Sequence, residues 1–319
     1  MNTILSVNVS TVYNLENHRV NGDGDKRQKE VSGRAYVSGQ KIRFMLFEKM
    51  KDLVRVNGVQ DSISCGDGKT GDISKDIVSD LGGYMITEKN SKSRTRKSPI
   101  NVSFSVAKNV SEYFDDLFVR FSNFESSKDN EKQRINTQTY SVKDVFSFNY
   151  QLNCDEVGVE KYVRINDNIF LKEVQLLCIP NDEKIKRIGY FIQSINGLVG
   201  LANTSRNAVE DTPKNIFIAF DTKRKFVKYF DLTENEKVVY IDDLKKRGIT
   251  YFIGDSEKKC GVSVDEVIEK SLNYIKNNTS LFSKIEFSQE ALDERDKYIL
   301  ENKTNSTNNK KDKTESVAE

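Results

Sequence analysis

The stretch Leu5-Ser6-Val7-Asn8-Val9-Ser10 alternates apolar and polar side chains, a period of two that predicts a β-strand with one apolar and one polar face. We expect this opening strand to be half-exposed and to be followed by a polar loop over residues 14–34. From Gln40 onward the period becomes helical, because the apolar residues between positions 42 and 54 form one stripe. Ser38 is placed to cap this helix at its N-terminus.

Further elements follow along the chain. Alternating apolar residues predict strands at 102–106, 146–152, 216–220 and 226–230. Apolar spacing from Ile185 to Leu198 predicts a second amphipathic helix, and a capping box of Ser263 and Glu266 begins another. The order strand, helix, strands, helix, strands predicts an α+β protein with the ferredoxin-like βαββαβ core that RRM proteins use. The aromatic pattern by which RRM sheets stack on bases is missing, so any nucleic acid would be held by its backbone.

Composition excludes several classes of protein. The 319 residues include one histidine, His18, and four scattered cysteines, which excludes multi-histidine metal sites and offers no zinc or disulfide pattern. His18 stands in a polar stretch and is expected at the surface. Neither a Walker nor a Rossmann motif is present, so we expect no cofactor. Without a membrane-length apolar run or a secretory signal, we expect a cytoplasmic protein with no membrane partner.

An anion-binding pattern lies at the start of the first helix. A helix N-terminus offers free N–H groups and a partial positive charge, and Gly39 lets a phosphate approach without a Cβ in the way. Gln40 can donate a hydrogen bond, while Lys41 and Arg43 add positive charge, so this start could hold a phosphodiester without reading its base. An ordinary capped helix with surface cations would show the same pattern.

Two more segments are candidates for contact with a polyanion. Residues 89–97 contain five cations and no acid in a Ser, Thr and Asn setting, although a solvated basic loop has the same composition. The second helix ends near Gly197 and Gly200, and Asn203 and Arg206 beyond them could grip a nucleic-acid backbone. Glycines just past a helix are more often C-caps than phosphate cradles.

Several blocks occur together in an order that points to one family. They are Asp80-Leu-Gly-Gly-Tyr-Met85 with Ser98-Pro-Ile-Asn-Val-Ser103 after it, the opening strand with its Asn14 loop, the helix start at 37–43, the strand exit at 150–158 and the helix of Arg187. This set resembles the DevR family, which supplies the backbone subunit of type I-B CRISPR Cascade complexes within the RAMP superfamily. Two positions depart from the family pattern: Gly82 replaces an aromatic residue, and Gly200-Leu201 replaces a double glycine.

The resemblance implies a non-catalytic subunit with one RRM-like palm over residues 1–288. Three insertions would project from it, finger-like at about 56–100, a polar loop at 124–139 and a candidate thumb at 199–214, while 289–319 would be a disordered polar tail. The implied partners are CRISPR RNA, the target DNA strand, further copies of the chain, and the large subunit, handle-capping subunit and repeat-processing endonuclease of Cascade.

The same resemblance, taken with the charge pattern, assigns the RNA-binding residues. We expect the helix start and the opening loop to hold the RNA backbone, the basic segment to lie in the finger, and the exit loop to lie near the thumb. The residues are Asn14, Ser38, Gly39, Gln40, Lys41, Arg43, Lys92, Arg94, Arg96, Lys97, Asn203 and Arg206.

Two other classes of function remain open from the sequence. RAMP relatives in type III complexes cut target RNA with an aspartate in the loop after the first strand, and Asp23 and Asp25 occupy a comparable loop here. Acids in a Gly-rich turn are, however, common turn formers. The modest net charge of +2 also leaves open a third class, a standalone regulatory or scaffold protein that binds no nucleic acid.

Overall fold

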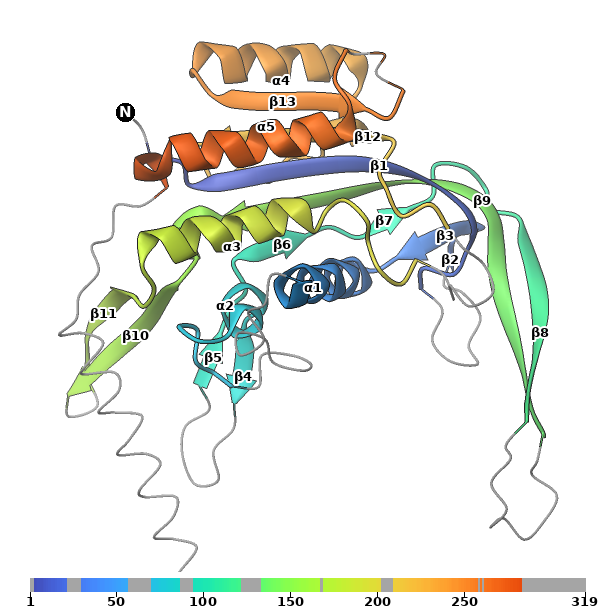
Figure 1. The fold of residues 1–319 in the computed structure, drawn as a ribbon, viewed down its shortest axis with the longest axis horizontal. Helices are drawn as coiled ribbons and strands as arrows, with labels where there is room; N and C mark the ends of the chain where they lie inside the picture. Colours follow the sequence, from blue (N-terminus) through green and yellow to red (C-terminus); the bar gives the residue numbers. More distant parts are fainter. Residues whose placement is uncertain are drawn as a thin grey trace, which may run out of the picture.

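An antiparallel sheet forms the centre of the computed structural model, which describes residues 3–21, 30–56, 70–86, 94–121, 133–166, 169–201, 209–257, 259 and 261–282 (Figure 1). Its strands run in the order β13-β12-β1-β9-β6, and β8 pairs with the first half of β9. Their bounds are β1 Ser6–His18, β6 Ile100–Val102, β8 Tyr113–Phe121, β9 Gln133–Asn153, β12 Asn215–Asp221 and β13 Thr250–Asp255.

The core of this sheet has the predicted ferredoxin-like connectivity. In chain order β1, α1 (Gly39–Val56), β6, β9, α3 (Asn181–Gln193) and β12 form a βαββαβ unit. The sheet order β12-β1-β9-β6, with every pair antiparallel, places the third strand of the unit between the first and the second. The α+β prediction is therefore confirmed. The structure adds β13 at the edge, with α4 (Glu234–Lys246) and α5 (Val264–Asn277) beside it.

The helices divide between the two faces of the sheet (Figure 1). α1, α3 and α5 pack on one face, where Met45, Ile188 and Val267 join Val9 and Ile218 in the main core. α4 covers the other face through a smaller cluster that includes Phe217 and Tyr240. α5 begins with the predicted capping box, in which Ser263 accepts from the N–H of Glu266 and Glu266 accepts from the N–H of Ser263.

The polar face of β1 is buried, and the expectation of a half-exposed strand was wrong. Ser10 donates to Oδ1 of Asn149 at 2.5 Å and accepts the N–H of Phe230 at 3.3 Å. Asn149 in turn donates to Asp231 at 3.3 Å. These contacts come from a 3-10 turn, η3 (Tyr229–Asp231), which stands where the sequence predicted a strand at 226–230. This turn partners Ser10, and β9 supplies partners for Asn8 and Thr11, so the buried polar groups of β1 are satisfied from both sides.

His18 is also buried, contrary to the surface position predicted for it. β1 continues through the first part of the predicted polar loop. His18 is the last residue of the strand and pairs with Ser141 of β9. Its Nε2 donates to Oδ2 of Asp144 at 2.7 Å, and its ring packs edge-on against Phe146. Asp144 also accepts from Ser111 at 2.6 Å. A buried charge satisfied in this way holds together β1, β9 and the segment that precedes β8.

Smaller strands and turns complete the described chain. A three-stranded sheet consists of β2 (Glu30–Val31), β3 (Arg34–Val37) and β7 (Ser105–Val106), and the remaining turns are η2 (Cys154–Glu156) and η4 (Thr279–Leu281). Two hairpins and the β8–β9 arm reach away from the sheet (Figure 1). The hairpins are β4 (Tyr84–Ile86) with β5 (Arg94–Arg96), which follow the short α2 (Ile77–Gly82), and β10 (Val159–Asn166) with β11 (Ile169–Leu177). Across the described residues, no helix combines the length and apolarity needed to cross a bilayer.

Two further predictions, a polar loop and a strand, differ from the structure. β9 begins at Gln133, so the second half of the polar loop expected at 124–139 is strand rather than loop. The strand expected at 102–106 is two short strands, β6 and β7, which join different sheets. Residues 202–208 of the candidate thumb lie outside the described residues.

Candidate nucleic-acid interface

An open hollow of about 460 Å³ lies where α1 begins. It is lined by Tyr36, Ser38, Gly39, Gln40, Arg43, Val102 and Phe104. Four of the predicted RNA-binding residues therefore share one surface, and β3, the start of α1 and the link between β6 and β7 supply its walls. A cavity of this size lies within the range of roughly 300–1,000 Å³ that small-molecule sites occupy.

The start of α1 has the predicted cap and leaves N–H groups free. The hydroxyl of Ser38 accepts from the N–H of Lys41 at 3.2 Å, and its carbonyl accepts from Ile42 at 3.0 Å. Within the described part of the chain, the N–H groups of Gly39 and Gln40 donate to no carbonyl or side chain. A Cβ on Gly39 would lie 3.1 Å from the carbonyl oxygen of Val102, so glycine lets the helix begin directly against β6. The hollow is therefore bordered by the positive end of a helix.

Lys41 connects this helix start to the exit of α3. A Cβ on Gly200 would lie 3.5 Å from Nζ of Lys41, so the two segments that the sequence analysis treated separately meet here. Gly200 has a φ of +89°, which favours glycine. Partial burial lowers the pKa of Lys41 from its ordinary value, and the nearby Glu48 offsets part of that shift. A bound anion would stabilise this partly desolvated ammonium group.

Arg43 has a contact inside the protein besides its place in the hollow. Its Nη2 donates to the carbonyl of Gly82, and its guanidinium lies 5.7 Å from the centre of the Phe47 ring. Arg43 thus ties α1 to the end of α2. Its predicted role in RNA binding stays a prediction.

The other predicted residues are scattered. Asn14 is exposed within β1, where it pairs with Val145, rather than in a loop. Lys97 is exposed directly after β5, and Arg94 pairs with Ile86 at the start of that strand. Outside the described residues lie Lys92, Asn203, Arg206, Asp23 and Asp25.

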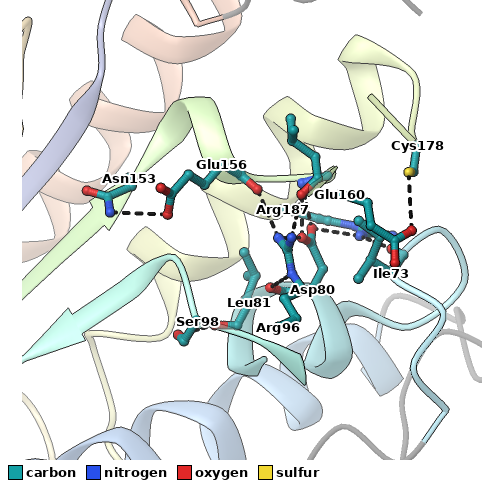
Figure 2. A network of polar contacts seen from close by, with 12 residues as sticks. Ile73, Asp80, Leu81, Arg96, Ser98, Asn153, Glu156, Glu160, Cys178 and Arg187 are labelled. Atoms are coloured by element: carbon teal, nitrogen blue, oxygen red, sulfur yellow. Dashed lines mark hydrogen bonds and ion pairs between the residues drawn. The ribbon is translucent and has the colours of Figure 1, made fainter. Parts of the chain in front are cut away.

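Arg96 differs from its prediction, because its guanidinium is used inside the protein (Figure 2). Nη2 donates to Oδ1 of Asp80 at 2.6 Å and to the carbonyl of Glu156 at 2.9 Å, and Nη1 donates to the carbonyl of Val159. Only 9% of the side chain is exposed. The structure therefore assigns Arg96 to the interior, where it connects β5 with η2 and β10.

Asp80 is the centre of this buried network, which the sequence analysis did not identify (Figure 2). Its side chain is fully buried, and both carboxylate oxygens accept from the N–H of Gly158 at 3.0 Å. Oδ2 also accepts from Nη1 of Arg187, which donates as well to the carbonyl of Ile73 at 2.7 Å. Burial lowers the pKa of Arg187, but Asp80 and Glu183 more than offset this and the pKa lies above its ordinary value.

The network fixes the module of α2, β4 and β5 to α3 and to the turn before β10. Asp80 comes from α2, Arg96 from β5, Gly158 from the turn before β10 and Arg187 from α3. Asp80 and Arg187 both lie in blocks that carry the family resemblance. Their presence in those blocks was the sequence signal that marked them as important. Their separation along the sequence does not show that the two side chains are in contact.

Comparison with known proteins agrees with this fold. The family model described as "CRISPR-associated negative auto-regulator DevR/Csa2" matches residues 8–247. A solved structure titled "CRISPR RNA-guided surveillance complex, pre-nicking" is similar at 11% identity with a TM-score of 0.53, covering 84% of this chain and 99% of that one. Another, titled "CRISPR RNA-guided surveillance complex", has 14% identity, the same coverages and a TM-score of 0.49. No curated protein matches.

Proposed function

This chain belongs to the DevR/Csa2 family of CRISPR-associated proteins, and on that premise we propose that it is the guide-binding backbone subunit of a type I-B Cascade surveillance complex. In this role it performs no catalysis. Copies of the chain line up along a CRISPR RNA in the cytoplasm and hold it by its sugar-phosphate backbone, so that the bases stay available for the target DNA strand. The other Cascade subunits are its further partners.

One observation carries this proposal more than any other. The hollow at the start of α1 combines the free N–H groups of Gly39 and Gln40 with a positive helix end and the half-buried Lys41 nearby. These groups recognise a phosphate and do not distinguish one base from another. Such a grip is what a subunit needs if it must accept guides of any sequence.

The decisive experiment is recovery of nucleic acid from the full-length protein, followed by binding of unrelated single-stranded RNAs across a salt series. We expect repeat-spacer RNA of uniform length, equal affinity for unrelated sequences, and a slope of log affinity against log salt of about −0.7 per phosphate contact. Absence of affinity at low salt would overturn the proposal, and so would cleavage of RNA by the purified protein.

A further inference from the structure

Phe104 is an aromatic side chain that the fold presents to solvent. β6 ends at Val102 and β7 begins at Ser105, so Phe104 belongs to neither strand. The start of α1 packs against this link, because a Cβ on Gly39 would lie 3.6 Å from the backbone nitrogen of Phe104. The break turns the side chain out of the core, and it is 55% exposed in the wall of the hollow.

The Phe104 ring has a positive charge over it and a second aromatic ring next to it. The Tyr36 ring, from β3, lies 5.9 Å away with an interplanar angle of 38°. Nζ of Lys228, which directly precedes η3, lies 5.2 Å from the centre of the Phe104 ring. Two separate parts of the fold thus bring aromatic rings to the hollow at the start of α1, and a third brings a cation to the Phe104 ring.

We propose that Phe104 is a stacking platform for one unpaired nucleobase of the RNA whose phosphate binds at the start of α1. This rests on the proposed function and adds a base contact to it. Stacking on an aromatic side chain accepts every base, because each base has a π-face, so the contact agrees with a grip that ignores sequence. Lys228 neutralises a phosphate next to the stacked nucleotide, and Tyr36 holds the Phe104 ring in place.

The test is a cycle that removes the ring and the base in turn. Full-length wild-type protein and Phe104→Leu are each titrated with an oligouridine RNA and with an abasic ribose-phosphate chain of the same length. Leucine keeps an apolar side chain but has no π-face. We expect the substitution to weaken binding of the RNA roughly 5- to 150-fold, the range for loss of one stacked base, and to leave binding of the abasic chain unchanged. Phe104→Trp should restore RNA binding.

The matched control is Phe114→Leu, which removes an exposed aromatic ring on β8 that does not line the hollow. It should bind both ligands like the wild type. Equal losses on RNA and on the abasic chain would overturn the platform, because the ring would then only support the fold. Unchanged RNA affinity with a changed oligomeric state would also overturn it and would place Phe104 in a contact between copies. If the wild-type protein binds neither ligand at low salt, the proposed function itself fails.

Discussion

Nη1 of Arg187 donates a hydrogen bond of 2.8 Å to Oδ2 of Asp80, across 107 positions of sequence. The other oxygen of Asp80 accepts from Arg96 at 2.6 Å, so one buried carboxylate contacts two guanidinium groups. Glu183 accepts the Nε of Arg187 at 3.0 Å and supplies the second negative charge. Asp80 is therefore the charged centre of the contacts that attach the α2 module to the rest of the fold.

Asp80→Asn should lower the free energy of unfolding by about 3–5 kcal/mol, because it removes the carboxylate that pairs with Arg96 and leaves Arg187 with Glu183 alone. The change is measured by urea denaturation. Asp52→Asn is the matched control, since Asp52 pairs with Arg55 at the surface, where both side chains are more than half exposed. The control should change stability by less than about 1 kcal/mol. Similar effects of the two substitutions would contradict the central place of Asp80.

Gly83→Ala should destabilise the protein far more than Gly248→Ala. Both glycines have positive φ, +74° and +66°, so alanine is strained at either position, and more so at Gly83, where a ψ of 174° places the backbone in a region almost confined to glycine. At Gly83 the added Cβ would also lie 2.4 Å from the carbonyl oxygen of Arg96, whereas at Gly248 it meets nothing within 4 Å. Thermal unfolding of both variants compares strain alone with strain plus a backbone clash. Equal melting temperatures would show that the contact between α2 and β5 is looser than the structure has it.

Asp144 should make stability depend on pH in the acid range. Burial raises its pKa, but hydrogen bonds from His18, Ser111 and Ser141 outweigh this, and the pKa lies below its ordinary value. The unfolded chain therefore takes up this proton first. The stabilisation is complete well above the unfolded value of about 3.9, and it is lost as pH falls through that value and then through the folded pKa.

The measurement is the free energy of unfolding from pH 7 down to about pH 2.5. Asp144→Asn should be less stable than the wild type at neutral pH and should lose less stability on acidification. The same substitution at the exposed Asp242 serves as the control. If the free energy of unfolding of Asp144→Asn falls as steeply with decreasing pH as that of the wild type, other carboxylates account for the pH dependence.

Lys41→Gln should weaken binding of every RNA sequence by the same factor. If Lys41 neutralises one phosphate, the magnitude of the salt slope should fall by about 0.7. Fluorescence anisotropy with two unrelated RNAs at several salt concentrations measures both effects. Lys246→Gln makes the same change of charge on the exposed end of α4, which packs on the opposite face of the sheet, and should change neither. Loss of affinity for one sequence only would argue for base recognition at this site.

The local sequence pattern predicted correctly those elements that depend on contacts between near neighbours in the chain. The helix start at Ser38 and the capping box of Ser263 were predicted correctly because both depend on contacts within three residues of the sequence. The prediction of a strand at 226–230 was wrong because the apolar residues there pack into the cluster under α4 from a turn. Apolar spacing over so short a segment does not distinguish a strand from a turn. The prediction of a half-exposed first strand was wrong for a related reason: its polar groups find their partners on distant parts of the chain, Asn8 on β9 and Ser10 on both β9 and η3.

The sequence by itself determined the βαββαβ order, the cap of the first helix and, through its ordered blocks, the family. Only the tertiary structure decided which charged and aromatic side chains face solvent. The guanidinium of Arg96 is bonded inside the protein and Lys97 beside it is exposed, while Phe104 leaves the core at a break between two strands. The physical reason is that periodicity follows from neighbours along the chain, whereas exposure depends on what packs against a residue from distant elements, as Asp80 and Gly39 do here.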